Sequence, residues 1–362
     1  MSCRRRPRTG IRQVNGIATK GCPHVSSPYT HGPAHGYVPA VQARELLWYD
    51  DDVSAVILGG RYLLGRELGS GGYASVHEAT DLASGRDVAV KVVLPAYRGQ
   101  REVCERLERE GRIAASLAHP NVCAVSDVGH TDDGTAFIVL ERLTGETLAD
   151  RLARGRVSLD VALDVTTQLL RGLGAAHAAG IVHRDLKPAN VFLGDAGHGP
   201  VLVKLLDFGL AQVPNAPAFE GAALTRTGIV VGTPAYMSPE QVRGARDLDA
   251  RSDVYSVAVV VYETFAGERP FAELPQRDLL EAIAHRKPPS LATRAPSAPP
   301  SVVRAVDAAL SVSRTHRPAD ALALLDRLLD GASSPANAPD ARGVDDWDLP
   351  TWQGPPPSSR PR

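Results

Sequence analysis

The amino-acid sequence predicts an α+β fold in two lobes: a small lobe built on an antiparallel sheet with one helix, and a larger helical lobe. Before Leu140, short apolar runs are separated by Gly and Asp residues, which is typical of strands. After Leu140, apolar residues recur at helical spacing over longer stretches. A strand-rich half followed by a helix-rich half favours two lobes, with a ligand site in the cleft between them.

Each expected element has its own pattern. In the first half, short apolar runs predict strands, and an amphipathic stretch predicts one helix. In the second half, long periodic stretches predict helices, the first of which stops at Gly180, a residue type that commonly ends helices. The expected strands are residues 62–68, 75–80, 87–92 and 137–140, and the expected helices are residues 101–117, 159–178, 253–265 and 302–310.

Composition divides the 362-residue chain into three parts. Residues 1–55 mix Gly, Pro, His, Ser and Arg with little periodicity, which predicts a disordered N-terminal extension. Residues 333–362 are rich in Pro, Ser and Asp, which predicts a disordered tail. A single compact domain is therefore expected over residues 61–330, long enough to bury a sizeable core.

Charge and cysteine content restrict the partners and the compartment. The formal net charge of −1 argues against nucleic acid or an acidic membrane surface as an obligatory partner. The four cysteines show no CxxC or CxxH spacing, so they suggest neither a zinc site nor a disulfide framework, and they fit a reducing compartment. No apolar run reaches the about 18 residues of a membrane span, and no apolar segment follows the basic N-terminus as in a signal peptide. We therefore expect a cytoplasmic protein without a membrane span.

A glycine-rich segment, residues 69–76 (GSGGYASV), lies between two expected strands. Glycine lets backbone amides approach an anion closely, so such a segment can cover phosphate groups. No helix opens directly after it, which distinguishes it from the dinucleotide-binding fingerprint. By itself the segment fits a phosphate-binding loop and an ordinary hairpin turn equally well.

Lys91 ends an apolar run, where a lysine is costly unless its charge is used. In the next helix, Glu110 lies on the same face as Leu107 and Ala114, which mark the side that points inward. A carboxylate on an apolar face needs a cation, and Lys91 can supply it. The alternatives are a surface lysine and an accidental inward position of Glu110.

Residues 183–190 (HRDLKPAN) follow a helix and precede an apolar run. Asp185 is suited to accept a hydroxyl proton, Lys187 to neutralise a transferring phosphoryl group, and Asn190 to ligate a hard cation. Asp207 begins a DFG tripeptide at the end of the next apolar run and supplies a metal-binding carboxylate. An HRD tripeptide often arises by chance, whereas this complete ordered set almost never does.

The ordered set resembles the catalytic domain of eukaryotic-like, Hanks-type serine/threonine protein kinases of bacteria. The resemblance covers residues 61–330 and implies a bilobal protein-kinase fold that binds ATP and Mg²⁺, with Mn²⁺ as an alternative metal. The nucleotide contacts that it implies are Leu68, Gly69, Gly71, Gly72, Val76, Ala89, Lys91, Glu110, Glu141, Leu143 and Phe192.

The same resemblance assigns the catalytic roles. It implies that Asp185 orients or deprotonates the substrate hydroxyl, with Lys187 beside it. It implies that Asn190 and Asp207 hold the metal, and that Asp253 fastens the catalytic loop. The resemblance therefore implies a non-specific serine/threonine protein kinase that transfers the γ-phosphoryl group of ATP.

A further segment separates protein kinases from small-molecule kinases. Residues 232–240 (GTPAYMSPE) resemble the peptide-positioning loop of the family, which implies a substrate role for Thr233 and a structural one for Glu240. Arg317 occupies the position of the family's partner for Glu240. Lys187 and Thr233 match the serine/threonine pattern, so protein substrates with Ser or Thr hydroxyls are expected.

Regulation and two alternatives complete the expectations. Thr225 and Thr227 are candidate autophosphorylation sites, because Arg184 can pair with a phosphate there, although both can be ordinary loop threonines. A nucleotide-binding pseudokinase scaffold is the main alternative, opposed by the presence of Lys91 and the catalytic carboxylates. A small-molecule kinase is the second alternative. The resemblance also implies a homodimer through the small lobe, while the physiological substrate and the signal stay open.

Overall fold

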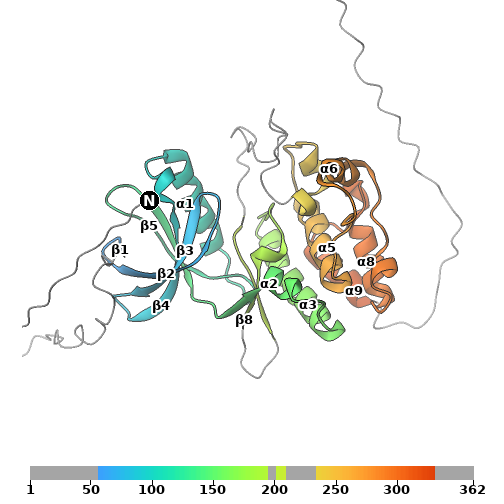
Figure 1. Ribbon diagram of the computed structural model, residues 1–362, viewed down its shortest axis with the longest axis horizontal. Helices are drawn as coiled ribbons and strands as arrows, with labels where there is room; N and C mark the ends of the chain where they lie inside the picture. Colours follow the sequence, from blue (N-terminus) through green and yellow to red (C-terminus); the bar gives the residue numbers. More distant parts are fainter. Residues whose placement is uncertain (1–55, 195–200, 209–233, 331–362) are drawn as a thin grey trace, which may run out of the picture. The chain divides into compact units, whose positions relative to one another are not determined.

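The computed structural model describes residues 56–194, 201–208 and 234–330 (Figure 1). The disorder expected for residues 1–55 and 333–362 concerns segments outside the described residues, so it stays a prediction. The small lobe comes first along the chain, and the helical lobe follows it. Within the described residues, the α+β, two-lobed fold predicted from the sequence is confirmed.

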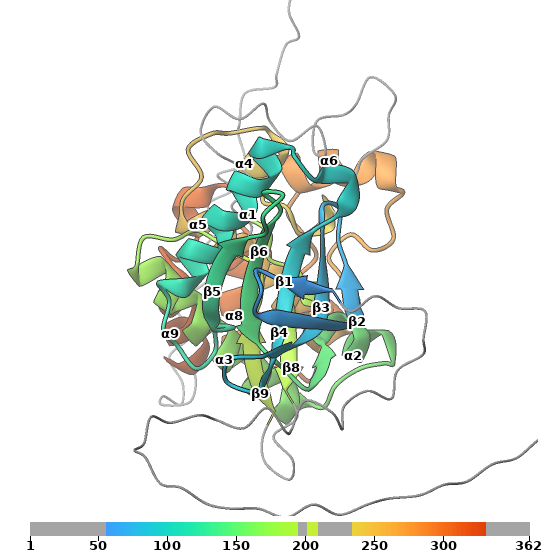
Figure 2. The ribbon, with the colours of Figure 1, turned by 90° about the vertical axis from the view of Figure 1, so that its left-hand side faces the viewer.

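The small lobe is an antiparallel sheet of six strands in the spatial order β1-β2-β3-β4-β6-β5 (Figure 2). All four expected strands are present, and β1 and β5 are additional. β5 contains Asp127 and His130 and lies at an edge of the sheet, so it lacks the apolar run that marks an inner strand. The strands are β1 (Ile57–Leu58), β2 (Tyr62–Ser70), β3 (Ala74–Asp81), β4 (Arg86–Val93), β5 (Val125–His130) and β6 (Ala136–Glu141).

Helix α1 (Arg101–Ala115) packs against β5 and β6. Its buried face contains Leu107, Glu110 and Gly111. A Cβ atom added at Gly111 would lie 2.8 Å from Val128 Cγ2 and 2.9 Å from Ile138 Cγ1, so only glycine permits this close approach. The contact brings the α1 backbone down onto the sheet and carries Glu110 toward β4.

The larger lobe is built around α3 (Leu159–Ala178) and α5 (Ala250–Ala266). Helix α5 is buried on nearly all sides, which is expected of a helix at the centre of a domain. Helix α3 has the bounds expected from the sequence, and the chain turns beyond it at Gly180, whose φ is 73°. The other α-helices are α2 (Leu148–Ala153), α4 (Pro239–Val242), α6 (Gln276–His285), α7 (Leu291–Arg294), α8 (Pro300–Ala309) and α9 (Ala321–Leu329).

A second antiparallel sheet lies on the large-lobe side of the connection between the lobes. It has the order β7-β8-β9, with β7 at Gly145–Thr147, β8 at Val191–Gly194 and β9 at Leu202–Leu205. The short 3₁₀ turn η2 (Pro188–Asn190) leads directly into β8. This sheet therefore positions the segments that precede and follow the catalytic motifs. The remaining 3₁₀ turns are η1 (Pro95–Tyr97), η3 (Pro234–Tyr236) and η4 (Arg314–His316).

Candidate active site

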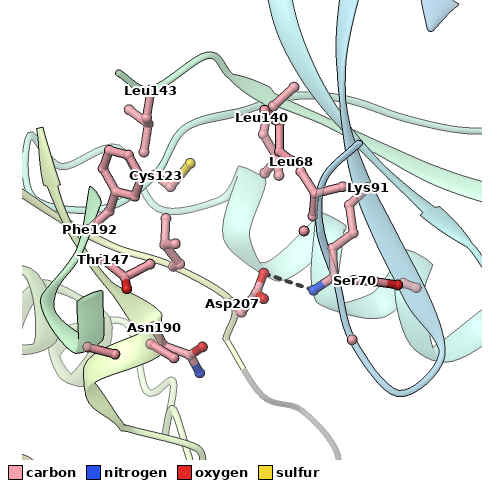
Figure 3. A pocket seen from close by; sticks show the side chains of 18 of the residues that line it. Leu68, Ser70, Lys91, Cys123, Leu140, Leu143, Thr147, Asn190, Phe192 and Asp207 are labelled. Carbon is pink, nitrogen blue, oxygen red and sulfur yellow. Dashed lines mark hydrogen bonds and ion pairs between the residues drawn. The ribbon is translucent and has the colours of Figure 1, made fainter. Parts of the chain in front are cut away.

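A cavity of about 1060 Å³ is lined by residues of both lobes (Figure 3). The structure brings the expected nucleotide, catalytic and metal residues together around this one space. Their individual roles stay predictions. Those that line it are Leu68, Gly69, Gly71, Gly72, Val76, Ala89, Lys91, Glu110, Glu141, Leu143, Asp185, Lys187, Asn190, Phe192 and Asp207.

The glycine-rich segment is the turn of the β2–β3 hairpin. The amide of Gly71 donates to the carbonyl of Ala74 at 2.8 Å and closes the turn. A Cβ atom added at Gly69 or Gly72 would meet no atom within 4 Å. Both residues line the cavity, so the absence of side chains leaves open space beside the backbone. That space suits an anionic group held by main-chain amides.

Lys91 joins carboxylates from both lobes. Its Nζ lies 2.5 Å from Glu110 Oε1, and the lysine is only 8% exposed. The same Nζ lies 2.8 Å from Asp207 Oδ1 (Figure 3). Burial lowers the pKa of Lys91, but the charges of Asp207 and Glu110 outweigh it and hold the pKa above its usual value. Burial also raises the pKa of Asp207, and Lys91 reverses that effect, so the net shift is downward. The lysine and Asp207 are therefore charged at neutral pH.

Asp253 on α5 fixes the backbone of the catalytic segment. Its Oδ2 accepts from the amide of His183 at 2.6 Å, and its Oδ1 accepts from the amide of Arg184 at 2.8 Å. His177 donates from Nε2 to the same carboxylate at 3.0 Å, while its Nδ1 accepts from the amide of Ala321 at 3.2 Å. Because Nδ1 accepts, Nε2 carries the proton. One buried carboxylate thus connects α3, α5, α9 and the catalytic segment.

The side chains at the start of η2 form a compact polar group. Lys187 Nζ lies 2.7 Å from Asp185 Oδ2, and Asn190 Nδ2 donates to the carbonyl of Asp185 at 2.8 Å. The Asp185 side chain is 52% exposed toward the cavity, which leaves it accessible to a substrate. A carboxylate in this position can accept a proton from a bound hydroxyl group, and the lysine can neutralise an adjacent anion.

Two residues of the site have unusual backbone conformations. Arg184 has φ of 68° and Asp207 has φ of 44°, in the left-handed region that non-glycine residues rarely adopt. Such conformations persist only where the surroundings hold them, and they gather at functional sites. Here Asp253 holds the Arg184 amide and Lys91 holds the Asp207 carboxylate. The strain therefore lies at the motifs to which the sequence assigns the catalytic and metal-binding roles.

The oxygen atoms of Asn190 and Asp207 fit a hard divalent cation, and the cavity fits a nucleoside triphosphate. Asn190 uses its Nδ2 for the loop carbonyl, which orients the amide and makes Oδ1 its ligand atom. Lys91 contacts Oδ1 of Asp207, so Oδ2, the second oxygen of that carboxylate, is the candidate ligand atom. Amide and carboxylate oxygens are the ligands that Mg²⁺ and Mn²⁺ prefer. Figure 3 shows Asn190 and Asp207 on the same side of the cavity.

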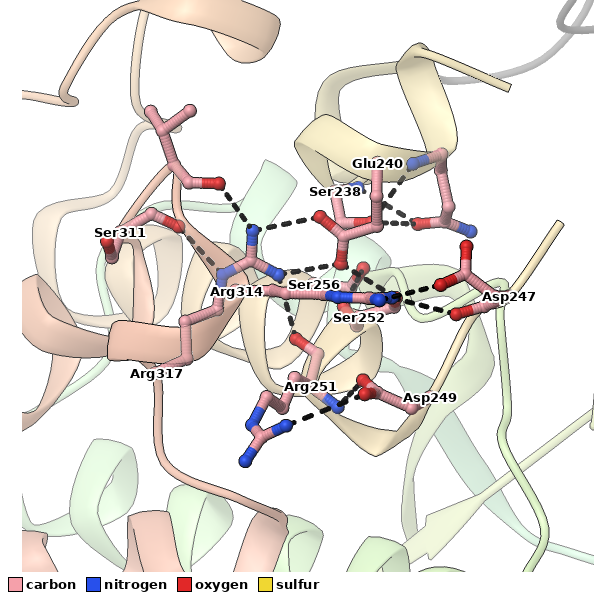
Figure 4. Close-up of polar contacts among 12 residues, drawn as sticks. Ser238, Glu240, Asp247, Asp249, Arg251, Ser252, Ser256, Ser311, Arg314 and Arg317 are labelled. Atoms are coloured by element: carbon pink, nitrogen blue, oxygen red, sulfur yellow. Dashed lines mark hydrogen bonds and ion pairs between the residues drawn. The ribbon is translucent and has the colours of Figure 1, made fainter. Parts of the chain in front are cut away.

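The expected partner of Glu240 is also in place (Figure 4), and neither residue lines the cavity. Arg317 donates from NH1 and NH2 to the two carboxylate oxygens at 2.7 and 2.9 Å, and both residues are buried. Arg317 also donates to the carbonyls of Ser311 and Arg251, and Ser252 Oγ donates to Glu240 at 2.7 Å. This network fastens the end of the peptide-positioning segment to α5 and η4.

Three predicted residues cannot be placed. Thr225, Thr227 and Thr233 lie outside the described residues, so their proposed roles stay predictions. Gly209 of the DFG tripeptide lies outside them as well, whereas Phe208 is described and packs against His183 with ring centroids 5.0 Å apart.

Some residues in and around the site were not predicted from the sequence. Tyr73, in the glycine-rich turn, and Cys123 both line the cavity. Burial raises the pKa of Cys123 to about 12, so the thiol is protonated at neutral pH. Lys204 on β9 is buried and lies 2.7 Å from Glu141. The signal for Lys204 was available, because a lysine inside an apolar run is the same pattern that singled out Lys91.

The family is decided by a match to a sequence model. Residues 62–333 match the model of the protein kinase domain. The chain belongs to the protein kinase family. The resemblance inferred from the motifs is therefore confirmed, and the kinase domain accounts for both lobes and for the cavity between them.

Serine/threonine-protein kinases of bacteria are among the curated relatives of this kinase domain. It is 42% identical over 262 residues to serine/threonine-protein kinase PknA of Mycobacterium tuberculosis, covering 70% of this chain and 57% of that protein. It is 36% identical over 279 residues to serine/threonine-protein kinase pkn3 of Myxococcus xanthus, covering 75% of this chain and 50% of that protein. The chain spans about half the length of these relatives.

Solved structures similar to this kinase domain share its fold. The PknI kinase domain of Mycobacterium tuberculosis matches with a TM-score of 0.58 and 25% identity, covering 77% of this chain and 98% of that chain. Rad53 in complex with AMP-PNP matches with a TM-score of 0.59 and 25% identity, covering 74% of this chain and 64% of that chain. Among the described residues, no helix is long and apolar enough to span a membrane.

Proposed function

We propose that this chain is a serine/threonine protein kinase that transfers the γ-phosphoryl group of ATP to hydroxyl groups of proteins. One observation carries the proposal: Lys91 contacts Glu110 and Asp207 at once, at 2.5 and 2.8 Å. This arrangement orients a cation and a metal-binding carboxylate toward the same cavity. It also opposes the pseudokinase alternative, since every charged group that phosphoryl transfer requires is present and paired.

Different residues of the cavity bind the phosphates, the adenine and the metal of the nucleotide complex. The turn at residues 69–72 covers the phosphates with backbone amides, and Lys91 pairs with the α- and β-phosphates. Ala89, Leu143 and Phe192 supply an apolar slot for the adenine. Asn190 and Asp207 would hold Mg²⁺, or Mn²⁺ in its place. The metal, when bound, neutralises charge on the β- and γ-phosphate oxygens.

The reaction needs one proton acceptor and one cation near the substrate. The serine or threonine oxygen attacks the γ-phosphorus, the bond to the bridging β-oxygen breaks, and ADP leaves. Asp185 orients the hydroxyl group and accepts its proton, and Lys187 neutralises the transferring phosphoryl group. Asp253 keeps both residues in place by holding the backbone amides just before them.

Protein substrates are favoured over small molecules by the buried pair between Glu240 and Arg317. The pair stabilises a segment that the cavity itself does not need, and that segment resembles the peptide-positioning loop. The relatives PknA and pkn3 carry the name serine/threonine-protein kinase. Lys187 and Thr233 match the serine/threonine pattern, which supports the same hydroxyl class here.

The test is incubation of the purified full chain with γ-labelled ATP, Mg²⁺ and a generic protein acceptor, beside an Asp185→Asn variant. We expect label on protein with the wild type alone, and phosphosite mapping should locate it on serine or threonine. Binding of ATP without any transfer would favour the pseudokinase scaffold. A Glu240→Ala variant that still phosphorylates a metabolite at the wild-type rate would favour the small-molecule kinase.

Regulation, location and assembly are proposed from the sequence alone. We expect autophosphorylation of Thr225 or Thr227 to raise activity, because Arg184 precedes the catalytic aspartate. A cytoplasmic location and a homodimer through the small lobe complete the proposal. Wild-type chain that is fully active without phosphate at either threonine would contradict the regulatory part, and light scattering would test the dimer.

A further inference from the structure

Tyr73 lies at the tip of the turn that covers the cavity. The turn is closed by the hydrogen bond from the Gly71 amide to the Ala74 carbonyl at 2.8 Å. The carbonyl of Tyr73 accepts from the amide of Leu94 at 2.9 Å, which ties the turn to the end of β4. The tyrosine side chain packs against the cluster that contains Leu107 of α1, so it points toward the helix and away from the outer surface.

Two residues of α1 hold this side chain. The hydroxyl of Tyr73 donates to Glu110 Oε2 at 2.9 Å, and the guanidinium of Arg106 lies 4.7 Å from the centre of the ring. Arg106 and Glu110 are four residues apart, so they lie on the same face of the helix. Burial and the charge of Glu110 raise the pKa of Tyr73 above its usual value, so the hydroxyl stays protonated and donates at neutral pH.

The two oxygens of Glu110 therefore have different partners. Oε1 contacts Lys91 at 2.5 Å, and Oε2 accepts from Tyr73 at 2.9 Å. Glu110 is 5% exposed, and a buried carboxylate is costly unless both oxygens are bonded. Moving α1 away from the sheet would break both contacts together. The position of the phosphate-covering turn is in this way connected to the contact that orients Lys91.

We propose that Tyr73 is a positioning residue that closes the glycine-rich turn over the nucleotide when Glu110 is paired with Lys91. The inference deepens the proposed kinase function and rests on it for the identity of the nucleotide. The hydroxyl group of Tyr73 is bonded to Glu110, so the role proposed for it is to position the turn and not to contact the reacting groups. Its effect passes through Glu110, so it should appear in nucleotide affinity and in the mobility of the turn.

The test compares Tyr73→Phe with the wild type. We expect the dissociation constant for Mg²⁺ and AMP-PNP, measured by calorimetry, to rise about tenfold, the worth of one hydrogen bond to a charged group. Hydrogen exchange at the amides of residues 69–75 should become faster in the same variant. In steady-state kinetics we expect KM for ATP to rise while kcat changes less than about twofold. Tyr97→Phe removes a hydroxyl from another tyrosine of the same cluster and should change none of these values.

A double-mutant cycle locates the effect. In a Glu110→Ala background, Tyr73→Phe should have no further effect on nucleotide affinity, because its partner is already absent. Two outcomes would overturn the inference. The first is that Tyr73→Phe leaves the nucleotide affinity and the hydrogen exchange of the turn unchanged. The second is that Tyr73→Phe lowers nucleotide affinity as much in the Glu110→Ala background as in the wild type. Calorimetry and exchange need no catalysis, so they decide the role of Tyr73 even if the chain transfers no phosphate.

Discussion

Lys91 stabilises two carboxylates that its own lobe and the other lobe bring to it. Glu110 lies on α1 of the small lobe, and Asp207, which is 116 residues after Lys91, follows β9 of the large lobe. Both contacts are short and Lys91 is almost fully buried. Without the lysine, the buried carboxylate of Glu110 would have no cation and would repel the carboxylate of Asp207. The ion pairs therefore serve both orientation and the avoidance of that repulsion.

At this scale we predict that Lys91→Met lowers the free energy of unfolding by about 3 kcal/mol, because it leaves buried charge uncompensated. Transfer of phosphate should fall by about 100-fold or more. Urea denaturation and a labelled-ATP assay measure the two effects. Arg101→Met changes a side chain that is 89% exposed and serves as the control. Its free energy of unfolding should stay within about 0.5 kcal/mol of the wild-type value. Equal stability of Lys91→Met and the wild type would contradict the prediction.

At the scale of elements, the connection between the lobes is held from both sides. Glu141, at the end of β6, accepts from Lys204 of β9 at 2.7 Å. The next residue, Arg142, forms an ion pair with Glu78 of β3. Two consecutive residues are thus fastened to opposite lobes. The backbone between them borders the cavity, so these pairs influence how the adenine side of the site is shaped.

We predict that Lys204→Met raises KM for ATP about three- to tenfold, because Glu141 loses a charged hydrogen bond that orients the connecting segment. The value of kcat should change less than twofold, since Lys204 is not among the residues that line the cavity. Steady-state kinetics at several ATP concentrations distinguish the two parameters. A fall in kcat at an unchanged KM would show that the pair acts on the chemical step instead.

Helix α1 supplies a second prediction at this scale. Gly111→Val should lower the free energy of unfolding by about 1–3 kcal/mol, because its side chain would collide with Val128 and Ile138. Activity should fall as well, since a displaced helix carries Glu110 away from Lys91. Ala115→Val introduces the same side chain at the exposed last residue of the same helix and serves as the control. Only the Gly111 variant should lose activity.

At the scale of the whole molecule, buried polar groups connect segments that are distant in the chain. Asp253 joins α5 to the catalytic segment, and Glu240 joins α4 to Arg317 of the C-terminal part. Burial raises the pKa of Glu240, but Arg317 and Ser252 more than compensate, so its pKa lies below the usual value. A carboxylate whose pKa is lower in the folded state stabilises that state above its unfolded pKa.

The expected pH dependence follows from that direction. Glu240 contributes stability above the unfolded pKa of about 4.3, and the contribution is lost as the pH falls through the lower folded value. We predict that the difference in melting temperature between the wild type and Glu240→Gln is largest near pH 7 and shrinks toward pH 3. Glu281→Gln changes an exposed glutamate of α6 and serves as the control. A difference that stays constant over this range would refute the assignment.

The sequence by itself determined the family, the two-lobed fold and the chemical groups of the site. Motifs such as residues 183–190 have a fixed order and spacing, and apolar runs mark the inner strands because burial on both faces requires them. The edge strand β5 was not predicted, because a strand that is not buried on both faces can contain polar residues and needs no apolar run. The predicted Lys91–Glu110 pair could be found because two local patterns each left one charge without a partner.

Only the tertiary structure decided which side chains meet across long separations. The bond from Tyr73 to Glu110, the pair of Lys204 with Glu141 and the approach of Asp207 to Lys91 each join segments from different elements. Local periodicity states which face of an element is buried, but not what lies opposite that face. The opposing residue depends on how the elements pack, down to a contact as small as the missing side chain of Gly111.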